Sequence, residues 1–210
     1  MQQQNKNNTE EKKRETAIGR LEKIHPHKML LYLSIFGSSL IFLFMITAYT
    51  FSRPEEDFAN FIMPKSFIIS LVLLLFSSFF ISKVLPAFKK DDMQAVRRSL
   101  EITLLLGLAF TISQYVGWYE MNRSGIHLSG KDSGAYLYVV SGLHVLHLAA
   151  GLVFLTMTYT KVSTISRDPV KSLIMVTNPY QRIRLEMLTT YWHFIDILWV
   201  GLFFYFLFSF

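Results

Sequence analysis

Five long apolar segments alternate with short polar connections along this chain, and the segments are free of Asp, Glu, Lys and Arg except near their ends. A helix needs about 20 apolar residues to cross roughly 30 Å of hydrocarbon, which is the length of these segments. We therefore expect transmembrane helices at about residues 29–51, 67–85, 101–119, 135–159 and 188–210. All six prolines fall between the segments, so each helix can be continuous. The pattern predicts an all-α fold, a polytopic membrane helix bundle with five transmembrane helices.

The placement of Lys and Arg predicts the orientation of this bundle. Of the 21 Lys and Arg residues, 17 lie in the N-terminal tail and in the second and fourth connections, and 4 lie in the first and third. Because positive residues remain on the cytoplasmic side, we expect a cytoplasmic N-terminus and a C-terminus outside. This placement also accounts for the net charge of +6 without a nucleic-acid partner.

The amino-acid composition argues against a soluble domain and excludes sites that need cysteine. The chain is 51% hydrophobic and only 17% charged, which is too apolar for an ordinary soluble domain of 210 residues. It contains no Cys, which excludes disulfides, thiolate zinc sites and iron–sulfur clusters within the chain. Residues 1–27 are polar and of mixed charge, and they predict a disordered or interfacial tail before a transmembrane domain at 28–210.

Few polar residues lie at membrane depth, where each needs a partner. They are Gln114, His144, His147, His193 and Asp196, with Glu101 at a helix entrance. His144 and His147 share a helical face, as do His193 and Asp196. At 1.5 Å per residue, His147 and Asp196 each lie roughly 12 Å from the inner side, so neighbouring antiparallel helices would bring them to one level. We expect these two side chains to pair.

These groups allow a metal or haem site, a proton relay, or a polar clamp that joins helices by hydrogen bonds. We favour the clamp, because the His-x-x-His spacing lacks a third ligand. Trp118 and Trp192 lie near segment ends and are expected at the membrane interface, whereas Trp199 lies deeper and is expected to pack against a neighbour.

Two further patterns concern helix packing. The Phe-rich stretch at 73–80, LLLFSSFF, is expected to face lipid or neighbouring helices. Small residues at Gly107, Gly142 and Gly151 predict close approach of helix backbones.

Ordered motifs cover the last three apolar segments. Gln114, Trp118 and Gly125 precede YLYVVSGLHVLHLAAG at 136–151, and YWHFIDILW follows at 191–199. These stretches resemble the patterns Q…W…G…FYxLTGxHxxHVxxG and YWHFVDxxW of subunit III of the haem–copper terminal oxidases, in its short five-helix form. Arg97 and Arg98 also suit that family.

The resemblance implies a non-redox subunit with no catalytic residue of its own. In that family, haems and copper lie in subunits I and II, and subunit III packs beside subunit I, holds phospholipid and supports proton uptake and turnover. It implies a multi-pass protein of the bacterial inner membrane with no bound cofactor, and it leaves open a larger respiratory supercomplex. The candidate structural, lipid or interface residues are Arg97, Arg98, Glu101, Gln114, Trp118, His144, His147, Trp192, His193, Asp196 and Trp199.

The chain departs from the family pattern in two places. Ser38 and Ser39 stand where the family usually has an acidic pair in its first helix, and Val140 to Gly142 replace Ile-Thr-Gly. Roles that need the missing carboxylate are not transferred. Three alternatives stay open: a haem b membrane anchor using His144 or His147 with His193, a transporter or channel, and the subunit III-like partner of a nitric oxide reductase.

Overall fold

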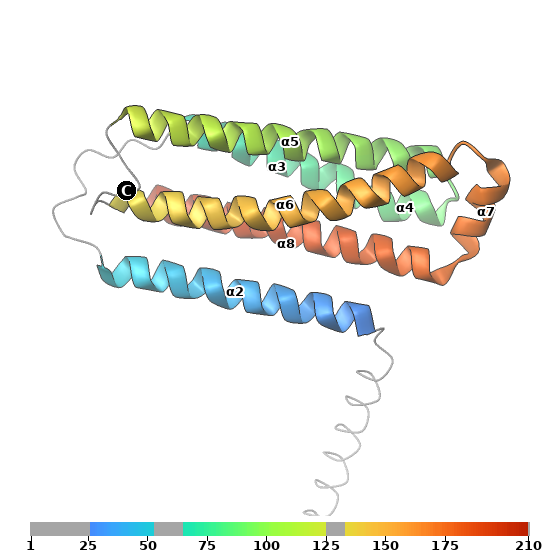
Figure 1. The fold of residues 1–210 in the computed structure, drawn as a ribbon, viewed down its shortest axis with the longest axis horizontal. Coiled ribbons are helices and arrows are strands. Elements are labelled where there is room, and N and C mark those ends of the chain that lie inside the picture. Colours follow the sequence, from blue (N-terminus) through green and yellow to red (C-terminus); the bar gives the residue numbers. More distant parts are fainter. Residues whose placement is uncertain (1–25, 53–64, 125–132, 210) are drawn as a thin grey trace, which may run out of the picture. The chain divides into compact units, whose positions relative to one another are not determined.

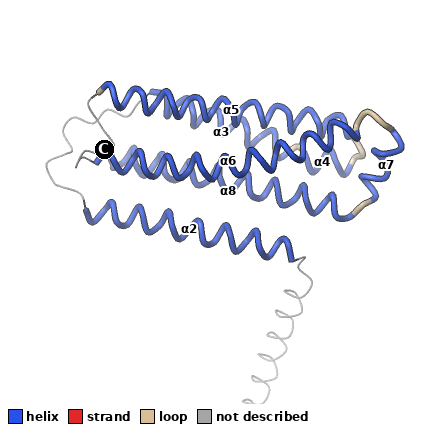
Figure 2. The backbone as a smooth tube through the Cα atoms, viewed as in Figure 1, coloured by secondary structure: helices blue, strands red, loops and turns tan. Residues whose placement is uncertain are grey.

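The computed structural model describes residues 26–52, 65–124 and 133–209, and the helices account for almost all of them (Figures 1 and 2). They are α2 (Pro26–Ser52), α3 (Lys65–Ser82), α4 (Val84–Lys89), α5 (Met93–Arg123), α6 (Ser133–Ile165), α7 (Pro169–Thr177) and α8 (Pro179–Ser209). Two units divide the chain, residues 1–38 and residues 39–210. The first contains only the beginning of α2 among its described residues, and α3 to α8 all lie in the second. The predicted tail at 1–27 lies outside the described residues except for its last two positions.

Five helices are long and apolar enough to cross a membrane, as the sequence predicts. Proline marks helix starts rather than interiors: α2, α7 and α8 each begin at a proline, and Pro86 lies in the first turn of α4. A proline there loses no hydrogen bond, because the first N–H groups of a helix have no partner within it.

A tight turn joins α4 to α5. Asp91 adopts a φ of 60°, a left-handed conformation that Asp tolerates better than most residues. Asp92 then caps α5, because its side chain accepts a hydrogen bond of 2.9 Å from the N–H of Ala95. The turn reverses the chain while satisfying the free N–H groups at the start of α5.

Helices α3, α5, α6 and α8 form a closed ring of contacts, in which α3 packs on α5, α5 on α6, α6 on α8 and α8 on α3. The short helices lie at one end of this bundle, α4 against α5 and α8, and α7 against α6 and α8 (Figure 1). Consecutive long helices therefore run in opposite directions, as a chain that crosses a membrane repeatedly must.

The helices extend beyond the predicted segments. α5 begins at Met93 instead of residue 101, and α8 begins at Pro179 instead of residue 188. The predicted segments ended at charged residues because they were defined as runs of apolar residues. A helix can continue beyond the hydrocarbon, where charged side chains are solvated. In α8, for example, Arg182 and Glu186 form an ion pair of 3.0 Å one turn apart. Helix α7 lies in the predicted fourth connection and was not anticipated, although Asp168 followed by Pro169 is a signal for a helix start.

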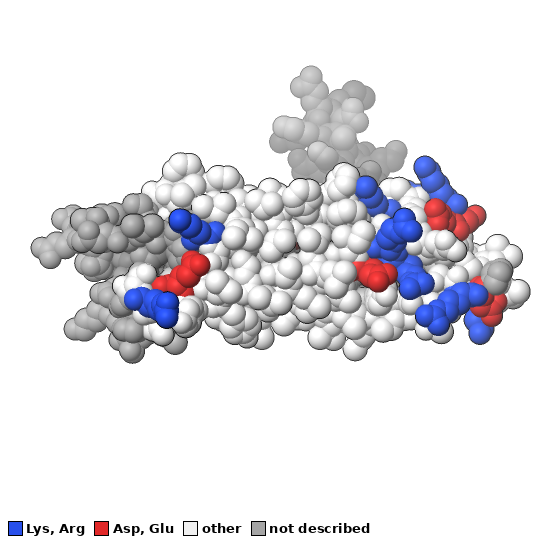
Figure 3. Space-filling model, turned by 90° about the horizontal axis from the view of Figure 1, so that it is seen from above, with Lys and Arg blue, Asp and Glu red and all other residues white. Residues whose placement is uncertain are grey.

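The bundle is apolar on its outer faces as well as inside. Large side chains such as Ile69, Leu105, Leu146 and Ile197 are exposed, and Figure 3 shows a band without charges between two charged ends. Since soluble proteins rarely expose such continuous apolar surface, these faces are suited to lipid.

Two predicted glycine contacts occur in the ring. A Cβ on Gly107 would lie 2.9 Å from Leu152, and one on Gly151 would lie 3.0 Å from Ile195. Gly142 has more room, with Trp118 at 4.0 Å. Close packing therefore depends on glycine at the first two positions.

Candidate functional site

Trp192 occupies the centre of the four-helix ring. It is fully buried, and its Nε1–H donates a hydrogen bond of 2.8 Å from α8 to the Ser77 hydroxyl on α3. Its ring also faces Gly107 of α5 and Gly151 of α6, so it touches all three neighbouring helices. The prediction that Trp192 belongs to an interfacial belt is wrong, because position near a segment end does not reveal which way a side chain points.

Trp118 is likewise a connection between helices. Its Nε1–H donates to the Ser141 hydroxyl on α6 at 2.9 Å, and the Tyr138 hydroxyl donates to the backbone carbonyl of Trp118 at 3.0 Å. Ser141 is itself buried and donates to the carbonyl of Leu137. The half-buried indole thus joins α5 to α6, which corrects the expectation of a purely interfacial side chain.

The predicted polar clamp is present at His193, whose Nδ1 lies 2.9 Å from the Ser78 hydroxyl on α3. His147 behaves differently, because its Nδ1 bonds to the carbonyl of Leu143 in its own helix at 2.9 Å. The Tyr191 hydroxyl reaches from α8 and donates to the carbonyl of His147 at 3.1 Å. Here the connection between α6 and α8 uses the tyrosine rather than the imidazole.

His144 is completely buried among aromatic rings. Its ring centroid lies 4.8 Å from that of Trp199 and 5.6 Å from that of Phe110, and Phe110 meets Trp199 edge to face at 5.3 Å. Neither ring nitrogen of His144 has a hydrogen-bond partner among the described residues. Trp199 therefore packs against neighbours as predicted, while His144 makes no hydrogen bond between helices.

Asp196 and Gln114 are buried, and their side-chain oxygen and nitrogen atoms lack hydrogen-bond partners within the described chain. Ser78 lies beside the carboxyl of Asp196 but does not complete a hydrogen bond to it. The predicted His147–Asp196 pair does not form.

The predicted depths nevertheless agree. His144 lies beside Trp199 and Gly151 lies beside Ile195, and these two contacts place His147 and Asp196 at similar levels on antiparallel helices. Depth follows from counting residues along each helix, whereas pairing also depends on how each helix is rotated. The predicted depths of His147 and Asp196 were therefore correct, but the prediction that the two side chains point toward each other was wrong.

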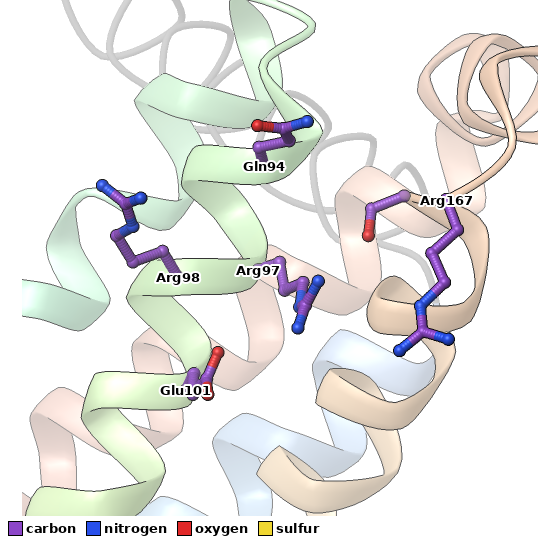
Figure 4. A pocket seen from close by; sticks show the side chains of 6 residues that line it. Gln94, Arg97, Arg98, Glu101 and Arg167 are labelled. Carbon is purple, nitrogen blue, oxygen red and sulfur yellow. The ribbon is translucent and has the colours of Figure 1, made fainter.

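Arg97, Arg98 and Glu101 lie together at the start of α5, where they line an open cavity of about 550 Å³ (Figure 4). Arg167, in the turn after α6, faces this cavity from the opposite wall. The sequence did not single out Arg167, because the turn that brings it to α5 depends on the unforeseen helix α7.

The chemistry available to these groups is chiefly that of packing and anion binding. Among the residues that the structure describes, no three His, Asp or Glu side chains come together in a way that could hold a metal ion. His144, His147 and His193 engage aromatic rings, backbone and serine, and none of the three lines the cavities described at one end of the bundle.

Three serines were missed by sequence reasoning: Ser77 and Ser78 on α3, and Ser141 on α6. A signal for the first two was available, because adjacent hydroxyls in the middle of an apolar span need hydrogen bonds. The stretch 73–80 does face outward at Phe76 and Phe79, as expected, while Ser77 between them is buried.

A family model described as cytochrome c oxidase subunit III matches residues 61–210. The chain belongs to this family. The match includes α3 to α8 and therefore every polar contact described above, whereas α2, with Ser38 and Ser39, lies outside it.

Individual relatives agree with membership of the cytochrome c oxidase subunit III family. A probable cytochrome c oxidase subunit 3 of Nocardia farcinica is 34% identical over 131 residues, which are 62% of this chain and 60% of that protein. A cytochrome c oxidase subunit 3 of Thermostichus vulcanus is 29% identical over 188 residues, 85% of this chain and 86% of that protein. A cytochrome bo(3) ubiquinol oxidase subunit 3 of Buchnera aphidicola is 30% identical over 136 residues, 65% of each. The chain thus covers less than two thirds of the Nocardia and Buchnera proteins.

Proposed function

We propose that this chain is a non-redox subunit III of a haem–copper respiratory oxidase, in which it supports the stability and proton uptake of the catalytic subunit during aerobic electron transport. The observation that carries the proposal is the family match over residues 61–210, which contains the whole four-helix ring. In this proposal the haems and copper of the oxidase belong to its other subunits, and no residue of this chain is catalytic.

The side-chain arrangement supports a structural role. Trp118, Trp192 and His193 each use a ring nitrogen to bond a serine on another helix, which fixes helix rotation in an environment where apolar burial alone gives little specificity. A rigid bundle of this kind is suited to hold a neighbouring subunit in one conformation. The outward apolar faces offer surface to subunit I, subunit II and lipid.

The proposed location is the bacterial inner membrane, with the N-terminus in the cytoplasm. The excess of Lys and Arg supports this orientation, because α4, α7 and the starts of α5 and α8 gather at one end of the bundle with their basic residues. Bound phospholipid and a larger respiratory assembly are further parts of the proposal.

Affinity purification of the tagged chain from its own membranes tests the proposal. We expect haem-containing subunits to co-purify and to give a Soret band, and we expect the chain to show no such band after it has been separated from them. A Soret band stoichiometric with the isolated chain would overturn the proposal in favour of a haem b anchor.

A histidine variant is the matched control for this experiment. His193→Asn removes the imidazole but keeps a polar side chain near Ser78. The haem content of the purified assembly should remain that of the unmodified assembly, because the histidine touches no iron. Loss of haem from an otherwise intact assembly would contradict the non-redox assignment.

A further inference from the structure

The cavity at the start of α5 is surrounded by positive charge. Arg97 and Arg98 come from α5, and Arg167 comes from the turn after α6, with Gln94 and Ser166 between them. Arg97 and Arg167 enter from opposite walls (Figure 4). The cavity, of about 550 Å³, thus presents guanidinium groups from two separate elements of the fold.

These guanidinium groups lack partners. In the part of the chain that the structure describes, none of the three arginines forms an ion pair or a side-chain hydrogen bond, and Glu101 is unpaired as well. The Nε of Arg97 is buried without any acceptor. Three positive groups and one carboxylate leave a net excess of two positive charges along the cavity, and this excess attracts an anion.

A phosphate group fits this arrangement better than a single carboxylate does. Each guanidinium presents paired N–H donors in a plane, and phosphate oxygens can accept such pairs from more than one arginine at once. The side-chain amide of Gln94 supplies a neutral donor at the rim of the same cavity.

The depth of the cavity favours a lipid as the source of that phosphate. The charge-free part of α5 begins at Ile102, and Arg97 precedes it by five residues, or roughly 7.5 Å along the helix axis. That distance places Arg97 in the headgroup layer just outside the hydrocarbon. A phosphate ester of the bilayer therefore lies at the level of the cavity.

Helix α7 gives an independent indication of the membrane surface. It follows Arg167 directly, and Val170, Leu173 and Ile174 lie on one face of it, exposed by 68%, 67% and 63%. Exposed apolar side chains at this spacing on a short helix suit the boundary between headgroups and acyl chains. The helix would thus lie among the lipids whose headgroups reach the cavity.

We propose that the cavity between Arg97 and Arg167 is a binding site for the phosphate of an anionic phospholipid headgroup. The site deepens the lipid-binding part of the proposed function, but it requires only that the chain lies in a bilayer. Arg98 borders both this cavity and a neighbouring one lined by Lys83 and Asp92, so it contributes positive charge to both.

Native mass spectrometry of the full chain tests this site. The purified, delipidated chain is titrated with phosphatidylglycerol, with phosphatidylcholine and, separately, with inorganic phosphate. We expect a retained phosphatidylglycerol adduct whose apparent affinity falls about tenfold or more in an Arg97→Gln/Arg167→Gln double variant, since two charge-assisted contacts are lost. Phosphatidylcholine should bind more weakly and respond less to the double variant.

Two control variants distinguish an effect of the cavity from an effect of the overall positive charge. Arg123→Gln removes an arginine from the opposite end of α5, and Lys90→Gln removes an exposed cation in the turn between α4 and α5 that does not line the cavity. Both should retain the lipid as the unmodified chain does. Circular dichroism and gel filtration of each variant establish that the bundle remains folded.

The outcomes separate the possibilities. Competition by millimolar inorganic phosphate would support the same phosphate site and identify a soluble anion as a second occupant, whereas no competition would assign the site to lipid. Equal lipid retention by the double variant and the unmodified chain would overturn the proposal. Loss of partner subunits from the double variant, with its lipid content unchanged, would also overturn it, because the arginines would then bind protein. Failure of co-purification with haem proteins would refute the oxidase role and leave this site untouched.

Discussion

The Gly107→Ala substitution tests whether Trp192 fixes the packing of the ring. A Cβ at this position would lie 2.9 Å from Leu152 Cδ2, and 3.1 and 3.2 Å from Trp192 Cη2 and Cζ2. The first contact is about 0.6 Å shorter than the roughly 3.5 Å at which carbon atoms pack, but a leucine methyl can turn away. The indole cannot, because it is buried on all sides and bonded to Ser77.

The expected cost follows from this difference in mobility. Overpacking a rigid site destabilises a protein by about 1–3 kcal/mol, and replacing glycine by alanine in a helix returns up to about 1 kcal/mol. Gly201→Ala measures that second effect alone, because nothing lies within 4 Å of a Cβ there. Relative to this control, Gly107→Ala should lower the free energy of unfolding by about 2 kcal/mol in a denaturant titration of the chain in mixed micelles.

A double-mutant cycle identifies the cause of the destabilisation. Trp192→Phe removes the indole edge that the new methyl would meet, so Gly107→Ala should be markedly less destabilising in that background. If Gly107→Ala is as harmless as Gly201→Ala, or if its effect is unchanged by Trp192→Phe, then the close approach seen here does not limit the packing of the ring.

Three further substitutions test other parts of the structure. Ser77→Ala should lower the free energy of unfolding by about 1 kcal/mol, because it leaves Trp192 Nε1 buried without an acceptor, and an unchanged unfolding curve would contradict this. Asp196→Asn should insert into membranes normally but should weaken association with the oxidase subunits proposed as partners, or shorten the activity of the proposed assembly during turnover, so unchanged assembly and lifetime would count against a structural role. At Asp168, the N–H of Lys171 holds the pKa of the capping carboxylate below its ordinary value. The cap on α7 should therefore persist at neutral pH and be lost only as pH falls below about 3.8, and hydrogen exchange of α7 should accelerate there or, at any pH, in Asp168→Ala.

The sequence was most informative about features that depend on a single quantity, such as the length of an apolar segment. Hydrophobic length located the five spans, and residue counting along two helices placed His147 and Asp196 at one depth. It was least informative where helix rotation decided the outcome. Whether Trp192 faces lipid or the ring centre depends on the relative rotation of four helices, and no period in the apolar segments reports it, because both faces of each helix are apolar.

The same limitation explains the candidate site. Arg97, Arg98 and Glu101 are close in sequence, so their grouping on α5 could be foreseen. Arg167 joins them only because the chain turns back after α6 into α7, and the helix-start signal of Asp168 before Pro169 does not by itself reveal that turn. The serine acceptors were recognisable as polar residues in apolar segments, but their partners were not.

The distribution of polar groups between α3 and α8 has a consequence for biogenesis. α8 carries both His193 and Asp196 and is less hydrophobic than α3, with mean hydropathy of 1.5 against 2.3 in their most apolar windows. The serine beside both residues, Ser78, lies on α3, which leaves the ribosome earlier. The costly final helix thus enters a membrane that already contains its polar neighbour, so the order of synthesis itself lowers the barrier to inserting the last span.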